Sequence, residues 1–270
     1  MKIAVSNIAW DFEEHEDVLA LLRERGVRGI EIAPTKLWPD WNGADGKSAA
    51  NWRQIYASAQ FELPSMQALL FGKPDLRVFG TDSEQEQTLN HIARVAELAA
   101  ALGAQPLVFG SPANRKRGEL SVDEAFNVAI DFFREAGRRC AAHGVWLCIE
   151  PLPEAYGSNF ITHWREAVDL VAAVDTPGFG LHLDTGCIHL AGDDPVEAVL
   201  ACKGITRHFH VSEPHLVDLS KPAIDHRRVG SALCQTGYTG WVSIEMRRAS
   251  HPLQSISQAV SHVSECYRND

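Results

Sequence analysis

The alternation of short apolar runs with amphipathic segments most restricts how this chain can fold. Eight runs have the length and composition of buried strands, and they lie at 2–7, 29–33, 63–69, 106–110, 145–150, 179–184, 208–213 and 241–245. Segments with helical periodicity separate them, in repeats of about 25 to 40 residues. Strict alternation implies a parallel sheet with right-handed crossovers, and eight units favour an α/β fold closed into a (β/α)8 TIM barrel.

Residues at the ends of the amphipathic segments support the helix assignments. Ser121 and Glu124 have the spacing of a capping box, which predicts a helix start there. Asp82 or Ser83 is expected to cap a second helix. Pro195, directly after an aspartate, is typical of a first helical residue.

The chain is expected to form one domain that covers residues 1–270. Its length suits a single α/β barrel, and no low-complexity linker interrupts it. An open doubly wound sheet is the competing fold. That fold usually carries a glycine-rich phosphate turn after its first strand, whereas residues 6–14 contain no glycine.

Composition restricts the classes of partner and the compartment. The formal net charge of −10 argues against nucleic acid or anionic membranes as main partners. No signal peptide is visible, and no apolar run approaches the roughly 20 residues of a membrane span. The six cysteines form no CxxC pair. We therefore expect a reduced, cytoplasmic protein.

Four consecutive predicted strands end on groups that can bind a metal. These are Glu150, Asp184, His210 and Glu245, spaced by about one βα unit each. Chemistry in such a barrel lies at the carboxyl ends of the strands, so the four side chains should converge. Three carboxylates in a barrel mouth need compensating positive charge, which a divalent cation supplies. Three oxygens and one nitrogen favour Mn²⁺, Mg²⁺ or Co²⁺, and Zn²⁺ is also compatible.

The segment RHFHVSEPH, residues 207–215, concentrates further polar groups around the imidazole ligand. Period-two alternation places His208 and His210 on one strand face. We predict that His208, Glu213 and His215 either support His210 or contact a substrate. Taken alone, the segment also fits a pair of hydrogen-bonded histidines near a strand end.

The ordered motifs IEP (149–151), LDTG (183–186), HFHVSE and SIEM (243–246) resemble a known family. They are similar to the xylose isomerase-like barrel superfamily, the sugar phosphate isomerase/epimerase group related to ketose 3-epimerases. The N-terminal GIEIAP fits the same resemblance. It implies that Glu150, Asp184, His210 and Glu245 bind the metal, and that Glu150 and Glu245 also act as acid and base.

A metal that chelates a sugar carbonyl and its neighbouring hydroxyl stabilises the enediolate left when the α-proton departs. Two glutamates on different sides of a small carbohydrate substrate permit epimerisation, because one removes a proton and the other returns it. One carboxylate serving both steps gives an isomerase. Loss of a β-hydroxyl gives a dehydratase. The four ligands leave these outcomes open.

Two positions depart from the ketose 3-epimerase pattern. Such enzymes usually carry a His three residues after the metal Asp, where this chain has Cys187, and an Arg six residues after the ligand His, where it has Leu216. His182, Cys187, His215 and Arg227 are candidates to replace those substrate contacts. Cys187 is either such a contact or a small packing residue.

Other candidate substrate contacts lie in loops at the same end of the barrel. Trp10 and Trp38 either stack on a sugar face or pack between loops. Arg115, in a basic loop, either meets an anionic substrate group or is solvated. Asn159 is a candidate for a hydroxyl contact.

Two other classes of protein compete with this interpretation. An endonuclease-like barrel of this superfamily needs three metals and additional His ligands, but MQALL (66–70), VFGSP (108–112) and Cys187 occupy those positions. A sugar-binding barrel without activity needs no pair of proton-transfer groups. A homo-oligomer is compatible with the fold by analogy alone.

Overall fold

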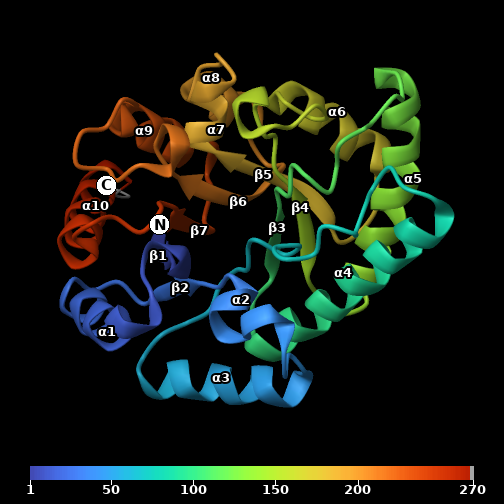
Figure 1. Cartoon of the computed structure of the whole chain (residues 1–270). Helices are drawn as coiled ribbons and strands as arrows, with labels where there is room; N and C mark the ends of the chain where they lie inside the picture. The colour runs from blue at the N-terminus through green and yellow to red at the C-terminus, as the bar shows by residue number, and fades with distance from the viewer. Residues whose placement is uncertain (268–270) are drawn as a thin grey trace.

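In the computed structural model, which describes residues 1–267, seven parallel strands form one curled sheet with helices around its outside (Figure 1). The sheet order is β2-β1-β7-β6-β5-β4-β3. The strands are β1 (Lys2–Ser6), β2 (Gly29–Glu31), β3 (Pro106–Phe109), β4 (Trp146–Ile149), β5 (Phe179–Asp184), β6 (Thr206–Val211) and β7 (Trp241–Ile244). All seven coincide with predicted strands, which confirms the α/β barrel class.

The eighth predicted strand, at 63–69, is wrong as a regular strand. Only isolated bridges form there, and Met66 bridges Ile32 on one side and Leu107 on the other. Pro64 has no N–H to donate, and Ala68 turns the chain with φ 54°. This irregular segment nevertheless lies between the sheet edges β2 and β3, where the eighth strand of a closed barrel belongs.

Ten α-helices within residues 1–267 surround the strands. They are α1 (His15–Glu24), α2 (Pro34–Leu37), α3 (Gly46–Ser58), α4 (Asp82–Leu102), α5 (Val122–Ala141), α6 (Trp164–Val174), α7 (Thr185–Leu190), α8 (Pro195–Ala201), α9 (His226–Thr236) and α10 (Pro252–Cys266). The expected strict alternation fails where two helices follow one strand, at α2 and α3 after β2 and at α7 and α8 after β5. No helix in this range has the length and apolar character needed to cross a membrane.

Local signals position most helix ends as predicted. The Ser121 hydroxyl accepts the Glu124 N–H and the Glu124 side chain accepts the Ser121 N–H, which confirms the capping box of α5. The expected cap of α4 is wrong by one residue. Thr81 is the N-cap, because it forms its own capping box with Glu84.

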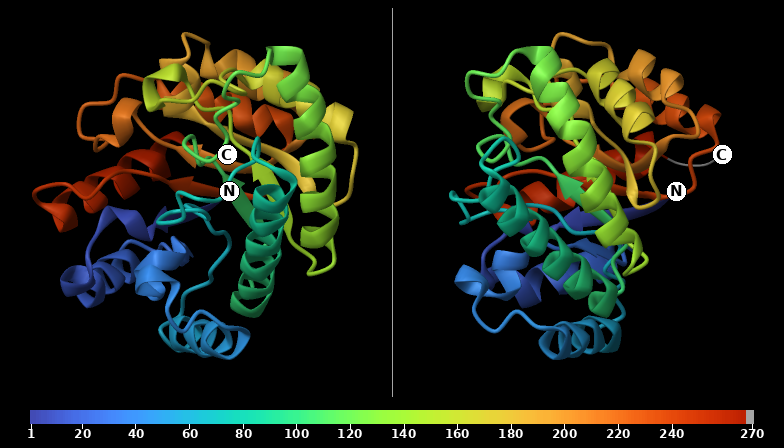
Figure 2. Two further views of the ribbon diagram at one scale, coloured as in Figure 1. Left: turned by 45° about the vertical axis from the view of Figure 1, so that its right-hand side comes forward. Right: turned by 90° about the vertical axis from the view of Figure 1, so that its right-hand side faces the viewer.

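Apolar helix faces build the layer outside the sheet. On α5, Phe133 stacks on Phe179 of β5 with ring centroids 5.0 Å apart, and meets Phe109 of β3 edge-on at 5.3 Å. Burial of one such ring stabilises the fold by about 1.5–3 kcal/mol. Helices α4 and α5 run alongside each other (Figure 2). Arg25, directly after α1, donates to Ser257 and Ser261 of α10, so the two ends of the helix ring adjoin.

Candidate metal centre

The four predicted metal ligands lie together at the carboxyl ends of four neighbouring strands. Glu150 follows β4, Asp184 ends β5, His210 lies in β6 and Glu245 follows β7. All four are buried, and one ligand atom of each lies within 4.8 Å of the others. The strands pair in the order β4-β5-β6-β7, so each contributes its group from an adjacent position.

The donor atoms are arranged for a cation. His210 Nδ1 lies 3.2 Å from Glu245 Oε2 and 3.8 Å from Asp184 Oδ2. Asp184 Oδ1 accepts the Cys187 N–H at 2.6 Å and the Ser212 hydroxyl at 2.8 Å. Its other oxygen, Oδ2, is buried and has no hydrogen-bond partner within residues 1–267. An orphaned carboxylate oxygen beside two more carboxylates and an imidazole fits a divalent metal ion.

The electrostatics of the metal-free site favour bound protons. Burial raises the pKa of Glu150 well above its ordinary value, and the charges of Glu245 and Asp184 raise it further. Burial also raises the pKa of Glu245, against the opposing effect of His210. Desolvation works against a charged His210, yet the carboxylates of Glu31 and Glu245 raise its pKa well above 6.5. A cation that binds here replaces these protons.

Glu31, at the end of β2, contacts the candidate site and was not among the residues predicted from the sequence. It is fully buried, and its Oε1 accepts from Ser65 Oγ at 2.7 Å and from His208 Nε2 at 2.8 Å. Its Oε2 accepts from Ser243 Oγ at 3.0 Å and lies 2.9 Å from His210 Nε2. Burial opposes ionisation, but His210 and His208 lower the pKa of Glu31 well below 4.5. A carboxylate inside the apolar run GIEIA was the available signal.

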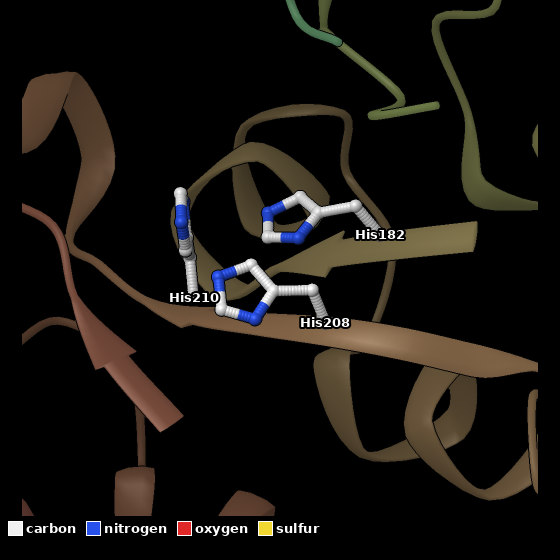
Figure 3. Close-up of side chains that lie close together, drawn as sticks. All are labelled: His182, His208 and His210. Carbon is white, nitrogen blue, oxygen red and sulfur yellow. The ribbon is translucent and has the colours of Figure 1, made fainter. Parts of the chain in front are cut away.

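Three imidazoles gather close together, as Figure 3 shows for His182 of β5 and for His208 and His210 of β6. The ring centroids of His182 and His210 are 4.2 Å apart. Both His182 nitrogens lack a hydrogen-bond partner in the described part of the chain, and Nε2 lies 3.7 Å from Glu150 Oε1. Burial lowers the pKa of His182 well below 6.5, so this ring is neutral.

A cavity of about 320 Å³ opens onto the carboxylates. Its wall includes Glu150, Glu245, Cys187 and Tyr156. Ala68, Ser111 and Leu216, also on the wall, have positive φ values of 54°, 46° and 56°. Left-handed backbone at non-glycine residues concentrates at functional sites.

Two larger cavities, of about 530 and 440 Å³, lie at the opposite end of the barrel. Both are lined by Pro106 and Arg207, which lie at the amino-terminal ends of β3 and β6. Neither is lined by the carboxylates of the candidate metal centre. The cavity of about 320 Å³ that Glu150 and Glu245 line is therefore the candidate substrate site.

Three of the predicted substrate contacts lie in or near this cavity. Cys187 lines it, and its Sγ is 3.9 Å from Glu150 Oε1. The exposed His215 packs its ring edge-on against Tyr156 of the wall, with centroids 6.0 Å apart. Arg115 is fully buried, and none of its guanidinium nitrogens has a hydrogen-bond partner within residues 1–267. Desolvation lowers its pKa to about 10, while the nearby Glu150 counteracts this shift.

Two predicted tryptophan contacts pack between loops instead. Trp10 Nε1 donates to His15 Nδ1, and its ring lines a separate cavity of about 390 Å³. Trp38 Nε1 donates to Ser48 Oγ at 3.0 Å. Both rings are buried, and neither lines the cavity at the carboxylates.

Further predicted contacts also lie outside the cavity wall. Glu213 is buried and accepts from His226 Nε2 at 2.7 Å, so it holds the loop after β6. The exposed Asn159 accepts the Arg117 N–H at 3.1 Å. Arg227 is exposed on α9. None of these three lines the cavity, and His208 contacts Glu31 beneath it.

Comparison with known proteins adds independent information. Residues 19–266 match the family model described as xylose isomerase-like TIM barrel. A ketose 3-epimerase of Arthrobacter globiformis is 28% identical over 90 residues, which is 33% of this chain and 31% of that enzyme. The match thus spans about a third of the relative's length.

Solved structures share the fold over the full length. D-psicose 3-epimerase from Clostridium cellulolyticum H10, solved with D-tagatose, has a TM-score of 0.81 at 15% identity and covers 100% of both chains. A probable 3-DHS dehydratase from Bacillus anthracis has a TM-score of 0.74 at 16% identity, again over 100% of both chains. At these identities the likeness establishes the barrel and leaves the reaction open.

Proposed function

Because this chain belongs to the xylose isomerase-like TIM barrel family, we propose that it is a divalent-metal-dependent isomerase or epimerase of a sugar or sugar phosphate. The observation that carries the proposal is the convergence of Glu150, Asp184, His210 and Glu245 on one point. Two of these groups, Glu150 and Glu245, also line a cavity of about 320 Å³, a volume within the range of small-molecule sites.

Asp184 and His210 hold the metal, together with Glu150 and Glu245. The oxygen-rich donor set favours Mn²⁺, Mg²⁺ or Co²⁺, and Zn²⁺ also fits. When bound, such an ion supplies Lewis acidity that polarises the substrate carbonyl and stabilises negative charge on the sugar oxygens. Asp184 is fixed for this task, because the Cys187 N–H and the Ser212 hydroxyl occupy one of its oxygens.

Glu150 and Glu245 are the proton-transfer groups of the proposal. Both carboxyls line the cavity, where they are within reach of a bound substrate, as proton transfer requires. Their strands, β4 and β7, are separated in the sheet by β5 and β6. The two carboxyls therefore approach a bound sugar from different sides, so that one removes the proton next to the carbonyl and the other returns it.

Part of the cavity wall is apolar. Leu152, Tyr156 and Leu216 supply apolar surface beside the carboxyls. Burial raises the pKa of the Cys187 thiol well above its ordinary value, so Cys187 is a small neutral wall residue rather than a thiolate ligand.

A dehydratase of a keto-sugar or keto-inositol is the second candidate. A probable 3-DHS dehydratase shares the full-length fold, so the barrel is compatible with this reaction. Cys187 favours it, because it replaces the histidine that ketose 3-epimerases usually carry at this position. The same metal ligands and proton-transfer groups serve both reactions.

Proton NMR in D₂O tests the proposal. The Mn²⁺-loaded protein is incubated with ketoses, ketose phosphates, keto-inositols and hydroxypyruvate, and the metal is removed before acquisition. We expect one α-proton to exchange and a new epimer or aldose to appear. New olefinic signals identify the dehydratase instead. Glu245→Gln should lower the rate by about 10²–10⁴-fold.

A matched control is Glu62→Gln, which changes an exposed carboxylate at the opposite end of the barrel. Its rate should equal that of the wild type. The proton-transfer roles are wrong if no compound exchanges while Glu245→Gln alters neither metal content nor sugar binding.

A further inference from the structure

Glu31 is a buried carboxylate to which the proposed metal binding and proton transfer give no role. It lies at the end of β2, four strands away from β5 in the sheet order, and is fully inaccessible to solvent. A buried carboxylate is costly unless it is fully paired. Glu31 meets this condition, because it accepts hydrogen bonds from Ser65, Ser243, Gln67 and His208. The imidazole of His210 adds an ion-pair contact, with Nε2 2.9 Å from Glu31 Oε2.

The two nitrogens of His210 face two different environments. Nδ1 points to the metal-binding carboxylates, 3.2 Å from Glu245 Oε2, whereas Nε2 lies 2.9 Å from Glu31 Oε2. An ionised carboxylate only accepts hydrogen bonds. In the absence of a cation both nitrogens face carboxylates, and a cation that takes the lone pair of Nδ1 leaves the ring proton on Nε2, next to Glu31.

The three-histidine cluster of His182, His208 and His210 is the competing explanation, because it can itself hold a metal ion. The Nε2 atoms of His208 and His210 both face oxygens of Glu31, at 2.8 and 2.9 Å. Their directions are thus accounted for by Glu31. A second cation bound through these two Nε2 atoms would have to displace Glu31.

We propose that Glu31 is the positioning residue of the metal centre. It holds His210 through Nε2, so that Nδ1 is presented to the metal in one tautomer and one orientation. Ser65, Ser243 and His208 in turn hold Glu31. This inference rests on the proposed metal dependence. Carboxylate–histidine–metal arrangements of this kind are common, and loss of the carboxylate usually costs 10–100-fold in metal affinity or activity.

The first measurement is the dissociation constant of Zn²⁺ and of Mn²⁺, determined for the apo-protein by competition with a chelator. Glu31→Gln keeps the side-chain shape and should weaken binding about 10–100-fold. Ser65→Ala removes one neutral donor and leaves the carboxylate, so it should weaken binding less than about tenfold. Unfolding temperatures of the apo-proteins show whether each variant is folded.

The second measurement reports the tautomer directly. In the Zn²⁺-loaded protein labelled with ¹⁵N-histidine, His210 should show a hydrogen-bonded Nε2 proton and a metal-shifted Nδ1. Glu31→Gln should shift or abolish that proton signal, which a purely structural role of Glu31 would leave in place. Should Glu31→Gln fail to fold, Glu31→Asp and Ser243→Ala are expected to give the same direction with a smaller loss.

The possible outcomes separate the two proposals. Unchanged metal affinity together with an unchanged His210 signal overturns the role of Glu31. Binding of two Zn²⁺ equivalents, with Nε2 of His210 metal-shifted, overturns it in favour of the histidine cluster. Weaker metal binding and a shifted His210 signal support Glu31 even if no sugar exchanges its α-proton, in which case only the proposed function fails.

Discussion

Gly110, directly after β3, has no side chain, and this leaves room for the carboxylate of Glu150 in the candidate site. A Cβ built at this glycine lies 2.4 Å from Oε2 of Glu150 and 3.5 Å from Cδ1 of Leu152. The φ of Gly110 lies outside the left-handed region, so an alanine suits this backbone. The effect of Gly110→Ala is therefore decided by what its methyl group meets.

The size of the effect follows from that contact. Cβ atoms essentially never approach another heavy atom within 3.0 Å, so the Glu150 carboxylate must retreat by at least about 0.6 Å. Displacing a catalytic group by about 1 Å costs roughly 10²-fold in rate. We expect kcat/KM to fall about 10- to 100-fold, which corresponds to about 1.4–2.7 kcal/mol of lost transition-state stabilisation.

Stability should change much less than activity. The group that must move is the far end of a flexible side chain, so the clash is relieved without a backbone shift. We expect the free energy of unfolding to fall by less than about 1 kcal/mol, at or below the lower end of the usual cost of overpacking.

The assay combines three measurements on Gly110→Ala: turnover of the substrate identified by NMR, Mn²⁺ affinity and urea unfolding. Gly46→Ala is the matched control, because its Cβ would meet only Glu97 Oε1, at an ordinary 3.5 Å. Wild-type turnover and metal affinity in Gly110→Ala would show that Glu150 does not work from the position seen in the structure. A loss of stability equal to the loss of activity would equally refute the argument.

Two further predictions concern the metal. Because Glu150, Glu245 and His210 have raised pKa values, protons compete with the cation, and metal affinity should rise with pH by up to about tenfold per unit for each proton displaced. Calorimetry in buffers of different ionisation enthalpy measures the released protons, and their absence would contradict the shifts. Removal of the metal by EDTA should lower the unfolding temperature by about 5–10 °C relative to protein with free metal at about 100 times Kd. Calorimetric scans that coincide before and after chelation would mean that the ion does not bind the folded state preferentially.

Local sequence patterns predicted the parts of the fold that local chemistry controls. Capping at Ser121 depends on residues within one helical turn, so the sequence was sufficient there. The 63–69 segment has the composition of a strand, but Pro64 and the turn at Ala68 interrupt its pairing. A hydrophobic pattern predicts which residues are buried. Regular pairing between strands also needs a backbone N–H donor, which proline lacks.

The convergence of the four candidate metal ligands was predictable because the carboxyl ends of parallel strands necessarily meet at one end of a barrel. Each ligand needed only its position at a strand end, and β4, β5, β6 and β7 are adjacent both in the sequence order of strands and in the sheet. Convergence was therefore a consequence of topology alone.

Only the tertiary structure decided which side chains surround that point. Glu31 reaches His208 across 177 positions of sequence, and its pairing depends on how far each side chain extends into the barrel. Arg115 is buried near Glu150 instead of being solvated in its loop, while the rings of Trp10 and Trp38 pack between loops. The sequence by itself determined seven strands of the α/β barrel and the four candidate ligands at strand ends, because both follow from patterns along single strands. The network around the ligands depends on packing between strands, which no single-strand pattern contains.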